Sequence, residues 1–259
     1  MSMQRQNNWV AFSTLLTREI RRFIRIWPQT LLPPAITMTL YFVIFGNLIG
    51  QRIGEMNGFA YIEYIAPGII MMAVINNAYA NVASSFFSAK FQNHIEELLI
   101  ATIPNYLILA GYVMGGVARG LLVGIIVTIV ALFFTKLHVQ HLFITLSMVI
   151  LSAVLFSLGG FINAIYGKSF DQIAIIPTFI LTPLTYLGGI FYSIDLLPEF
   201  WQQASLFNPI LYMVNAFRYG ILGVSDIPIR FAFGIIMLFI VGLASFALYL
   251  LNRGTGLRH

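Results

Sequence analysis

Six long apolar stretches constrain the fold of this chain more than any other feature. They cover residues 30–50, 60–85, 105–134, 142–166, 173–192 and 229–251. Roughly 20 consecutive apolar residues can cross the hydrocarbon core of a bilayer as a helix. Only 9% of the residues are charged, whereas a soluble domain carries about 25%. The sequence therefore predicts an all-α membrane protein, a single domain over residues 1–259 with six transmembrane helices.

The charges between these stretches predict the orientation of the chain. An even number of spans places both termini on one side of the membrane. The N-terminus, 86–104, 167–172 and the C-terminal tail together hold nine Lys and Arg against four acids, whereas the opposite loops hold four against five. Cytoplasmic loops are enriched in Lys and Arg. We therefore expect a multi-pass protein of the bacterial inner membrane with both termini in the cytoplasm.

The N-terminal segment 9–27 shows the pattern of an amphipathic helix at the membrane surface. Its apolar residues recur every three or four positions, as on one face of a helix: Trp9, Phe12, Leu16, Ile20, Phe23 and Trp27. Its arginines fall on the opposite face: Arg18, Arg21, Arg22 and Arg25. They are expected to point toward anionic headgroups or toward a cytoplasmic partner, and the segment also anchors the topology.

Residues 86–105 interrupt the apolar chain with charged side chains. The predicted helix, which Pro104 ends, has an apolar face: Phe91, Ile95, Leu98, Leu99 and Thr102. Lys90, Asn93 and Glu97 lie opposite, with Glu96 at the edge. The apolar face is expected to pack against the bundle, and the carboxylates to face the cytoplasm, where they can pair with arginines of another protein. The segment is thus predicted to dock a partner that supplies energy, although a solvated face is the plainer interpretation.

The third apolar stretch carries two series of glycines at four-residue spacing. Gly111 and Gly115 form one series, and Gly116, Gly120 and Gly124 form the other. Such spacing lets helices approach closely in a membrane, so these residues predict helix packing. Arg119 lies among them and is the only charge expected deep within a span. It is either an internal hydrogen-bond anchor or a substrate contact, since charges inside spans face protein or water.

The segment 181–220 is expected to lie at the outer face. It begins as the fifth apolar stretch, breaks at Gly188–Gly189, and continues as two short pieces that Pro198 and Pro209 punctuate. Pieces this short cannot cross the bilayer. With Trp201, Phe207, Tyr212 and Tyr219 they predict interfacial or re-entrant helices over 193–220, which either cover a transport path or form an ordinary aromatic belt.

Several kinds of chemistry find no support in the sequence. The run Gly167–Lys168–Ser169 resembles the end of a phosphate-binding loop, but that motif requires a glycine five residues earlier and a preceding strand. Position 162 is Ile at the end of an apolar stretch. The chain has no cysteine, and its histidines lack the spacing of metal ligands. We expect no catalytic residues, no metal site and no cofactor bound by this chain.

The segment 181–220 resembles the membrane-spanning subunits of ABC-2-type exporters. Their spaced pattern of apolar, small, proline and arginine residues is followed here by Leu181, Leu184, Leu187, Gly188, Ile190, Leu197, Pro198, Pro209, Ile210, Tyr212 and Arg218. The order of the spans and of the long loops is similar along the whole chain. Stretches such as PPAITMTLYFVIFGNLIG, NAYANVASSFFSAKFQ and PTFILTPLTYLGG are similar to one group of inner-membrane permeases in particular.

The resemblance implies a permease that works as a homodimer with two copies of a separate ATPase, which would bind ATP and Mg²⁺. It implies that 86–105 is the coupling helix, with the 9–27 helix beside it against the ATPase. The residues expected to couple are Phe91, Ile95, Glu96, Glu97, Leu98, Arg18, Arg22 and Arg25. The outer signature and re-entrant residues are Gly188, Pro198, Trp201, Pro209, Tyr212 and Arg218.

Two questions stay open at the level of the sequence. An ATP-independent secondary transporter or channel is the alternative function, although such proteins often carry paired intramembrane acids or repeated halves with broken helices, which this chain lacks. The substrate moved out of the cytoplasm or inner leaflet is a lipid, a glycan or a hydrophobic small molecule. The aromatic content of 15% suits all three.

Overall fold

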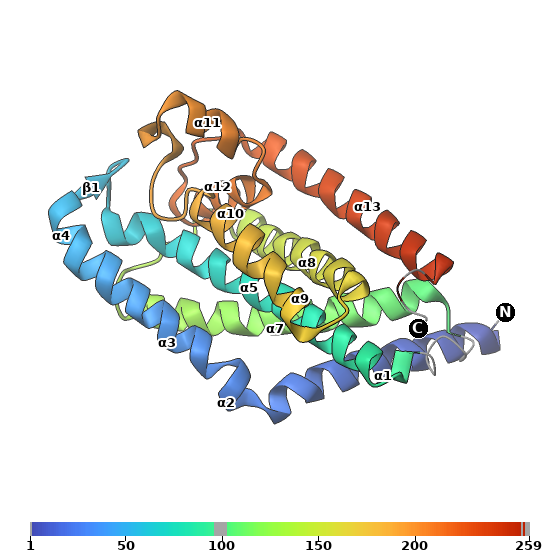
Figure 1. The fold of residues 1–259 in the computed structure, drawn as a ribbon. Helices are drawn as coiled ribbons and strands as arrows, with labels where there is room; N and C mark the ends of the chain where they lie inside the picture. The colour runs from blue at the N-terminus through green and yellow to red at the C-terminus, as the bar shows by residue number, and fades with distance from the viewer. Residues whose placement is uncertain (1, 96–102, 255, 257–259) are drawn as a thin grey trace.

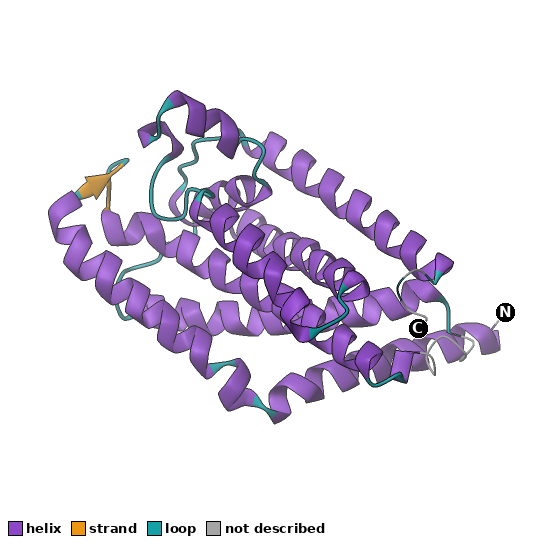
Figure 2. Cartoon of the chain, in the orientation of Figure 1, coloured by secondary structure: helices purple, strands orange, loops and turns teal. Residues whose placement is uncertain are grey.

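The computed structural model describes residues 2–95, 103–254 and 256, and these are helical almost throughout (Figures 1 and 2). Within them, five helical stretches are long and apolar enough to cross a membrane: Trp27–Ile53, Tyr61–Phe91, Asn105–Leu132, Leu142–Tyr166 and Ile229–Arg253. They correspond to the first four and the last of the predicted apolar stretches. The all-α class of membrane protein is therefore the one observed.

The first of these stretches is built from several helical pieces, and prolines mark where the first two begin. Helix α1 (Ser2–Arg25) is followed by α2 (Trp27–Thr30), α3 (Leu32–Tyr41), the π-helical η1 (Phe42–Ile49) and α4 (Gly50–Ile53). Pro28 lies in the first turn of α2, and Pro33 in that of α3, where a missing backbone N–H costs nothing. The chain therefore changes direction between α1 and α3 (Figure 1).

A two-stranded hairpin ends this first part of the chain. Strands β1 (Glu55–Met56) and β2 (Phe59–Ala60) pair antiparallel, with Glu55 opposite Ala60. Asn57 and Gly58 both have positive φ, at 50° and 79°, as a two-residue type I′ turn requires. The hairpin reverses the chain, and the next helix returns along the bundle.

Helix α5 (Tyr61–Phe91) is the centre of the molecule and is buried along almost its whole length. It packs against α7 (Asn105–Leu132), α8 (Leu142–Tyr166) and α12 (Pro209–Leu222). Glycines make these contacts close: a Cβ on Gly120 would lie 3.0 Å from the Cβ of Ala78, and one on Gly124 would lie 2.7 Å from Val74. The glycine series that begins at Gly116 therefore faces α5, as helix packing requires.

The fifth predicted span is shorter in the structure than in the sequence. It consists of α9 (Phe170–Ile176), the π-helical η2 (Pro177–Leu181) and α10 (Thr182–Tyr186), contiguous pieces of 7, 5 and 5 residues. At about 1.5 Å per residue they reach about 25 Å, slightly less than the hydrocarbon core of about 30 Å. The five residues after Tyr186 are not helical. A sixth membrane crossing here stays a prediction.

The outer segment divides at its prolines, as the sequence predicts. Helix η3 (Ile194–Leu196) precedes α11 (Glu199–Ser205), which Pro198 caps, and α12 begins at Pro209 after the Asn208 cap. The last helix, α13 (Ile229–Arg253), packs against α8 and α12 and leaves most of its surface exposed. Unlike a surface belt, α12 is almost wholly buried, because α5, α8 and α13 surround it.

The bundle has two distinct ends. Helix α1 and the C-terminal end of α13 lie toward one end, and the hairpin and α11 lie at the other (Figure 1). At the first end the Asn105 side chain donates a hydrogen bond of 2.7 Å to Asn252 Oδ1, which ties the start of α7 to the end of α13. We call this the terminal end and the opposite one the hairpin end.

Candidate functional site

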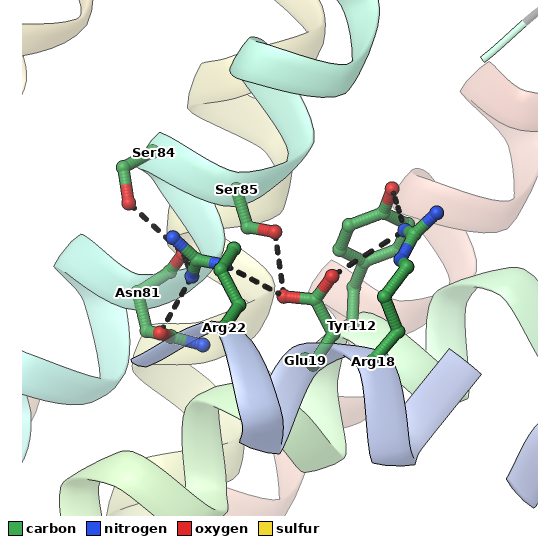
Figure 3. A network of polar contacts seen from close by, with 7 residues as sticks. All are labelled: Arg18, Glu19, Arg22, Asn81, Ser84, Ser85 and Tyr112. Atoms are coloured by element: carbon green, nitrogen blue, oxygen red, sulfur yellow. Dashed lines mark hydrogen bonds and ion pairs between the residues drawn. The ribbon is translucent and has the colours of Figure 1, made fainter. Parts of the chain in front are cut away.

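At the terminal end, a polar network fastens α1 to α5 and α7 (Figure 3). We call it the α1 clamp; its members are Arg18, Glu19, Arg22, Asn81, Ser85 and Tyr112. Glu19 is only 1% exposed, and its Oε2 accepts a hydrogen bond of 2.5 Å from the Ser85 hydroxyl on α5. A carboxylate is buried at such a place only when it is paired.

The two arginines beside Glu19 complete the clamp. Arg18 Nη2 lies 3.4 Å from Glu19 Oε1 and donates a 2.7 Å hydrogen bond to the Tyr112 hydroxyl on α7. Arg22 Nε lies 3.5 Å from Glu19 Oε2, and its Nη2 donates to the backbone carbonyl and the side-chain oxygen of Asn81, at 3.1 and 2.7 Å. The clamp thus joins three helices through one buried carboxylate.

The other glycine series of α7 brings α1 close enough for these contacts. A Cβ on Gly115 would lie 2.6 Å from the Cβ of Glu19, and one on Gly111 would lie 2.9 Å from the Cβ of Leu15. Both distances are shorter than normal packing allows. The absence of side chains at Gly111 and Gly115 therefore lets the short Glu19 side chain reach Ser85.

The Arg18 guanidinium keeps its charge in this environment. Partial burial acts to lower the pKa of Arg18, but the Tyr112 hydroxyl and the Glu19 carboxylate outweigh that effect, and the pKa is raised. Two arginines and one glutamate leave the clamp with an excess positive charge. The contacts are charge-assisted hydrogen bonds, which are stronger than neutral ones.

The clamp also involves the helices that border residues 92–104. Helix α5 ends at Phe91, a turn follows at residues 92 and 93, and α7 begins at Asn105. Residues 86–91, predicted as part of a separate coupling helix, therefore belong to α5. Because the apolar run of α5 continues through Phe86 and Phe87, nothing in this part of the sequence stops the helix earlier.

Lys90 occupies a different place from the one predicted. It was expected on the cytoplasmic face of the coupling helix, but it is 8% exposed. Its Nζ donates hydrogen bonds to the carbonyls of Ile165 and Gly167, at 2.5 and 2.9 Å. These carbonyls lie at the C-terminal end of α8, where helices leave carbonyl groups without partners and attract cations. Lys90 thus caps α8 from the end of α5.

The other coupling residues are distributed as follows. Ile95 is 2% exposed, whereas Phe91 is 62% exposed with its ring centroid 5.6 Å from that of Phe170. Arg25 and Arg21 are exposed and line a hollow of about 790 Å³ on α1, with Arg18 and Arg22. Glu96, Glu97 and Leu98 lie outside the described residues.

The face of α1 that the structure buries differs from the predicted apolar stripe. Leu15, Glu19 and Phe23 are buried, and of these only Phe23 belongs to the predicted stripe, whose first and last members, Trp9 and Trp27, are 69% and 52% exposed. Of the arginines predicted on the opposite face, Arg18 and Arg22 also make hydrogen bonds to α7 and α5, which the prediction did not include. Hydrophobic periodicity identifies the face that suits lipid, but it does not register a second face that packs on another helix.

Arg119 on α7 forms hydrogen bonds with two other helices, α2 and α5. Its Nη2 donates to the backbone carbonyl of Thr30 and to Asn77 Oδ1, at 3.3 and 3.2 Å. These contacts link α7 to α2 and α5. Of the two roles that the sequence left open, the geometry provides the internal hydrogen-bond anchor.

Arg119 is half-buried, whereas Arg218, which was expected in the outer segment, carries a more deeply buried charge. Arg218 on α12 is fully buried. Its Nε donates to the Tyr64 carbonyl at 3.3 Å, and its Nη2 donates to the Gly189 carbonyl at 2.6 Å. The guanidinium also lies 4.0 Å from the Tyr64 ring centroid, a favourable cation–π distance. Arg218 therefore holds α12, the start of α5 and the bend after α10 together at the hairpin end.

The remaining outer residues surround the same bend. Gly188 is buried, and a Cβ there would lie 2.7 Å from Ile210 Cγ2. The Tyr212 hydroxyl donates to the Leu206 carbonyl at 2.7 Å, while Trp201 on α11 is 46% exposed. Pro198 and Pro209 mark the starts of α11 and α12. The structure gives these residues packing and turn roles.

The clamp itself was not recognised from the sequence. Its partners are far apart, since Glu19 and Ser85 are separated by 66 positions and Arg18 and Tyr112 by 94. One local signal was available: Glu19 is four residues from both Leu15 and Phe23, so an acid interrupts an apolar helical face. A charge in that position indicates a polar partner on the neighbouring helix.

Comparison with known proteins identifies the class. Residues 10–222 match the family described as ABC-2 type transporter, which is most of the chain. The apolar helices and the glycine-packed bundle are consistent with this match to a membrane-transporter family. The chain belongs to the ABC-2 type transporter family.

Particular relatives narrow the class further. The chain is 59% identical over 251 residues to "Inner membrane transport permease YadH" of Escherichia coli (strain K12), covering 96% of this chain and 98% of the relative. It is 23% identical over 203 residues to "Nodulation protein J" of Rhizobium leguminosarum bv. viciae, covering 78% of each. This relative confirms the predicted similarity to one group of inner-membrane permeases, the YadH type. The relatives and the apolar helices support a multi-pass inner-membrane protein.

Proposed function

We propose that this chain is the membrane-spanning subunit of an ATP-driven exporter, with a separate ATPase bound at the terminal end. The α1 clamp is the observation that carries this proposal. It fastens α1 to α5 and α7, the two helices that border residues 92–104. A force applied to that segment would reach α5, α7 and α1 together, as a permease driven by a separate motor requires.

The orientation of the molecule supports the location of the ATPase. The distribution of Lys and Arg favours termini in the cytoplasm, and the terminal end carries α1 with its arginines. Arg21 and Arg25 are exposed beside a hollow of about 790 Å³. They are better placed than Arg18 and Arg22 to pair with carboxylates of a partner, because the clamp already uses the latter two.

A homodimer is supported by polar groups on one exposed face of the run 170–186. Thr178, Thr182 and Tyr186 are exposed at four-residue spacing. The Tyr186 hydroxyl lies 3.3 Å from that of Tyr41, and an aromatic contact of 4.5 Å joins Phe45 and Phe191 nearby. Side chains with hydroxyl groups can hydrogen-bond across helices that pack together in a membrane. We infer that this face meets a second copy or the transport path between two copies.

Co-purification tests the proposal. The chain is expressed with a candidate ABC ATPase, and the mass and ATPase activity of the purified material are measured. We expect a complex of two copies of each chain that hydrolyses ATP bound by the ATPase with Mg²⁺. A chain that purifies alone and moves substrate without ATP would instead establish the secondary transporter or channel.

Charge reversal at the terminal end then tests the docking surface. Arg21→Glu with Arg25→Glu is expected to reduce co-purification at least ten-fold, as is Glu96→Ala with Glu97→Ala if these carboxylates contact the ATPase. Arg230→Glu, at an exposed position of α13, is the matched control. If both double variants assemble and hydrolyse ATP normally, the docking assignment is wrong. The substrate, whether lipid, glycan or hydrophobic small molecule, would be identified with the assembled complex.

A further inference from the structure

A second hollow lies at the terminal end, between the end of α5 and the turn that joins α8 to α9. Its volume is about 520 Å³, within the range of about 300–1,000 Å³ typical of ligand pockets. The described residues that line it are Phe87, Lys90, Phe91, Asn93, Ile165, Tyr166, Gly167, Lys168 and Gly256. The site comes from three parts of the chain that only the fold brings together.

Two lysines make this hollow basic. Lys90 is fixed at the wall by its hydrogen bonds to the Ile165 and Gly167 carbonyls, and an ammonium group has three N–H donors, so it retains capacity for a further acceptor. Lys168 is exposed and lines the same hollow. Among the described lining residues no side chain is a carboxylate. The hollow therefore suits an anion.

Aromatic side chains lie next to the two lysines. The ring centroids of Phe87 and Phe170 are 4.8 Å apart, and those of Phe91 and Phe170 are 5.6 Å apart. Phe91, Phe170 and Tyr166 are 62%, 56% and 53% exposed. Aromatic residues gather at the level of the lipid headgroups, so this surface suits a ligand with a charged head and apolar chains.

We propose that this hollow binds the phosphate headgroup of an anionic phospholipid of the inner leaflet. Lys168 and Lys90 contact the phosphate, and the acyl chains leave along Phe91 and Phe170. Basic pockets between helices on the cytoplasmic side are known headgroup sites. The Gly167–Lys168 pair, which is not part of a nucleotide-binding loop, thus contributes to a phosphate site of another kind. The inference does not depend on an ATPase partner.

Binding of defined lipids to the purified full-length protein tests the inference. Native mass spectrometry measures the affinity for phosphatidylglycerol and for zwitterionic phosphatidylcholine, with inorganic phosphate as a competitor. Lys168→Ala is the main variant because the side chain is exposed and its loss leaves the α8 cap intact. Lys168→Arg restores the charge. Lys136→Ala is the control, since Lys136 is exposed in the loop at the hairpin end.

We expect wild-type protein to prefer phosphatidylglycerol over phosphatidylcholine. Lys168→Ala should weaken binding of phosphatidylglycerol about five-fold, which is the contribution expected of one lysine at an anionic surface. Lys168→Arg and Lys136→Ala should retain the wild-type affinity. Equal loss in Lys168→Ala and Lys136→Ala, or no loss in either, would overturn the proposal. So would displacement of the lipid by millimolar inorganic phosphate, which would indicate a site for the free anion.

Discussion

Glu19 shows how one residue can decide the position of a whole helix. It is 1% exposed, and its carboxylate accepts from Ser85 while lying 3.4 and 3.5 Å from the guanidinium groups of Arg18 and Arg22. Removing one member of such a group leaves the others partly buried without partners, which costs more than the contact itself contributes. The carboxylate is therefore the member whose loss should matter most.

Replacing Glu19 by alanine is expected to loosen α1. We expect a loss of about 1–3 kcal/mol of stability, seen as a lower melting temperature of the detergent-solubilised protein. Glu19→Gln should have a smaller effect, because the amide oxygen can still accept from Ser85. Glu55→Ala removes an exposed acid at the hairpin end and serves as the control. If Glu19→Ala melts with the wild type, the clamp does not hold α1.

Arg218 likewise connects several elements at the hairpin end. Its charge is fully buried, and backbone carbonyls and the Tyr64 ring surround it. The bend at Gly189, where φ is +68°, presents one of those carbonyls. The family signature thus contains a residue whose observed contacts are internal to the bundle.

At the scale of elements, α7 is shaped by two glycine faces. Gly111 and Gly115 pack against α1. Gly116, Gly120 and Gly124 pack against α5, and Gly116 also packs against α8. Because a membrane offers little hydrophobic force between helices, close contact of backbones supplies much of their attraction. The two faces let one helix pack closely on partners from separate parts of the chain.

Gly115→Ala tests the face that receives α1. The new Cβ would lie 2.6 Å from the Cβ of Glu19, so α1 must shift, and overpacking of this kind costs about 1–3 kcal/mol. Gly234→Ala on α13 is the matched control, because nothing lies within 4 Å of its Cβ position. That variant should be neutral or slightly stabilising, since alanine favours helix over glycine. Equal melting temperatures for the two variants would contradict the role of this face.

At the scale of the whole molecule, the orientation in the membrane decides which end meets the cytoplasm. The counts of Lys and Arg favour the terminal end. Both the ATPase surface and the headgroup site depend on this orientation, because a motor that uses ATP and the inner leaflet belong to the cytoplasmic side.

Cysteine labelling tests the orientation without interference, since the chain has no cysteine of its own. Glu55→Cys in the hairpin should react with a membrane-impermeant maleimide in intact spheroplasts. Gln92→Cys, in the exposed turn after α5, should react only after lysis. Gly234→Cys, on the outer surface of α13, controls for labelling within the lipid. The reverse labelling pattern would show that the terminal end faces away from the cytoplasm. It would then contradict the proposal that the ATPase binds beside the α1 clamp.

The sequence determined much of the architecture of this protein. Length and apolarity are local properties, so they were sufficient to place five long helices, and the prolines at 28, 33, 198 and 209 marked where helices begin. The four-residue spacing of glycines likewise predicted that α7 packs closely against neighbouring helices. The spaced pattern from Leu181 to Arg218 also identified the family, because many fixed intervals rarely agree by chance.

Only the tertiary structure decided how the charged residues are used. Lys90 was expected at a cytoplasmic surface and instead caps α8, Arg18 and Arg22 turn toward the bundle, and Arg218 is buried. Each outcome depends on a partner 29 to 154 positions away, and periodicity within one helix carries no information about such a partner. A charge tolerates burial only where the fold supplies hydrogen bonds, so its place is settled by which helices meet.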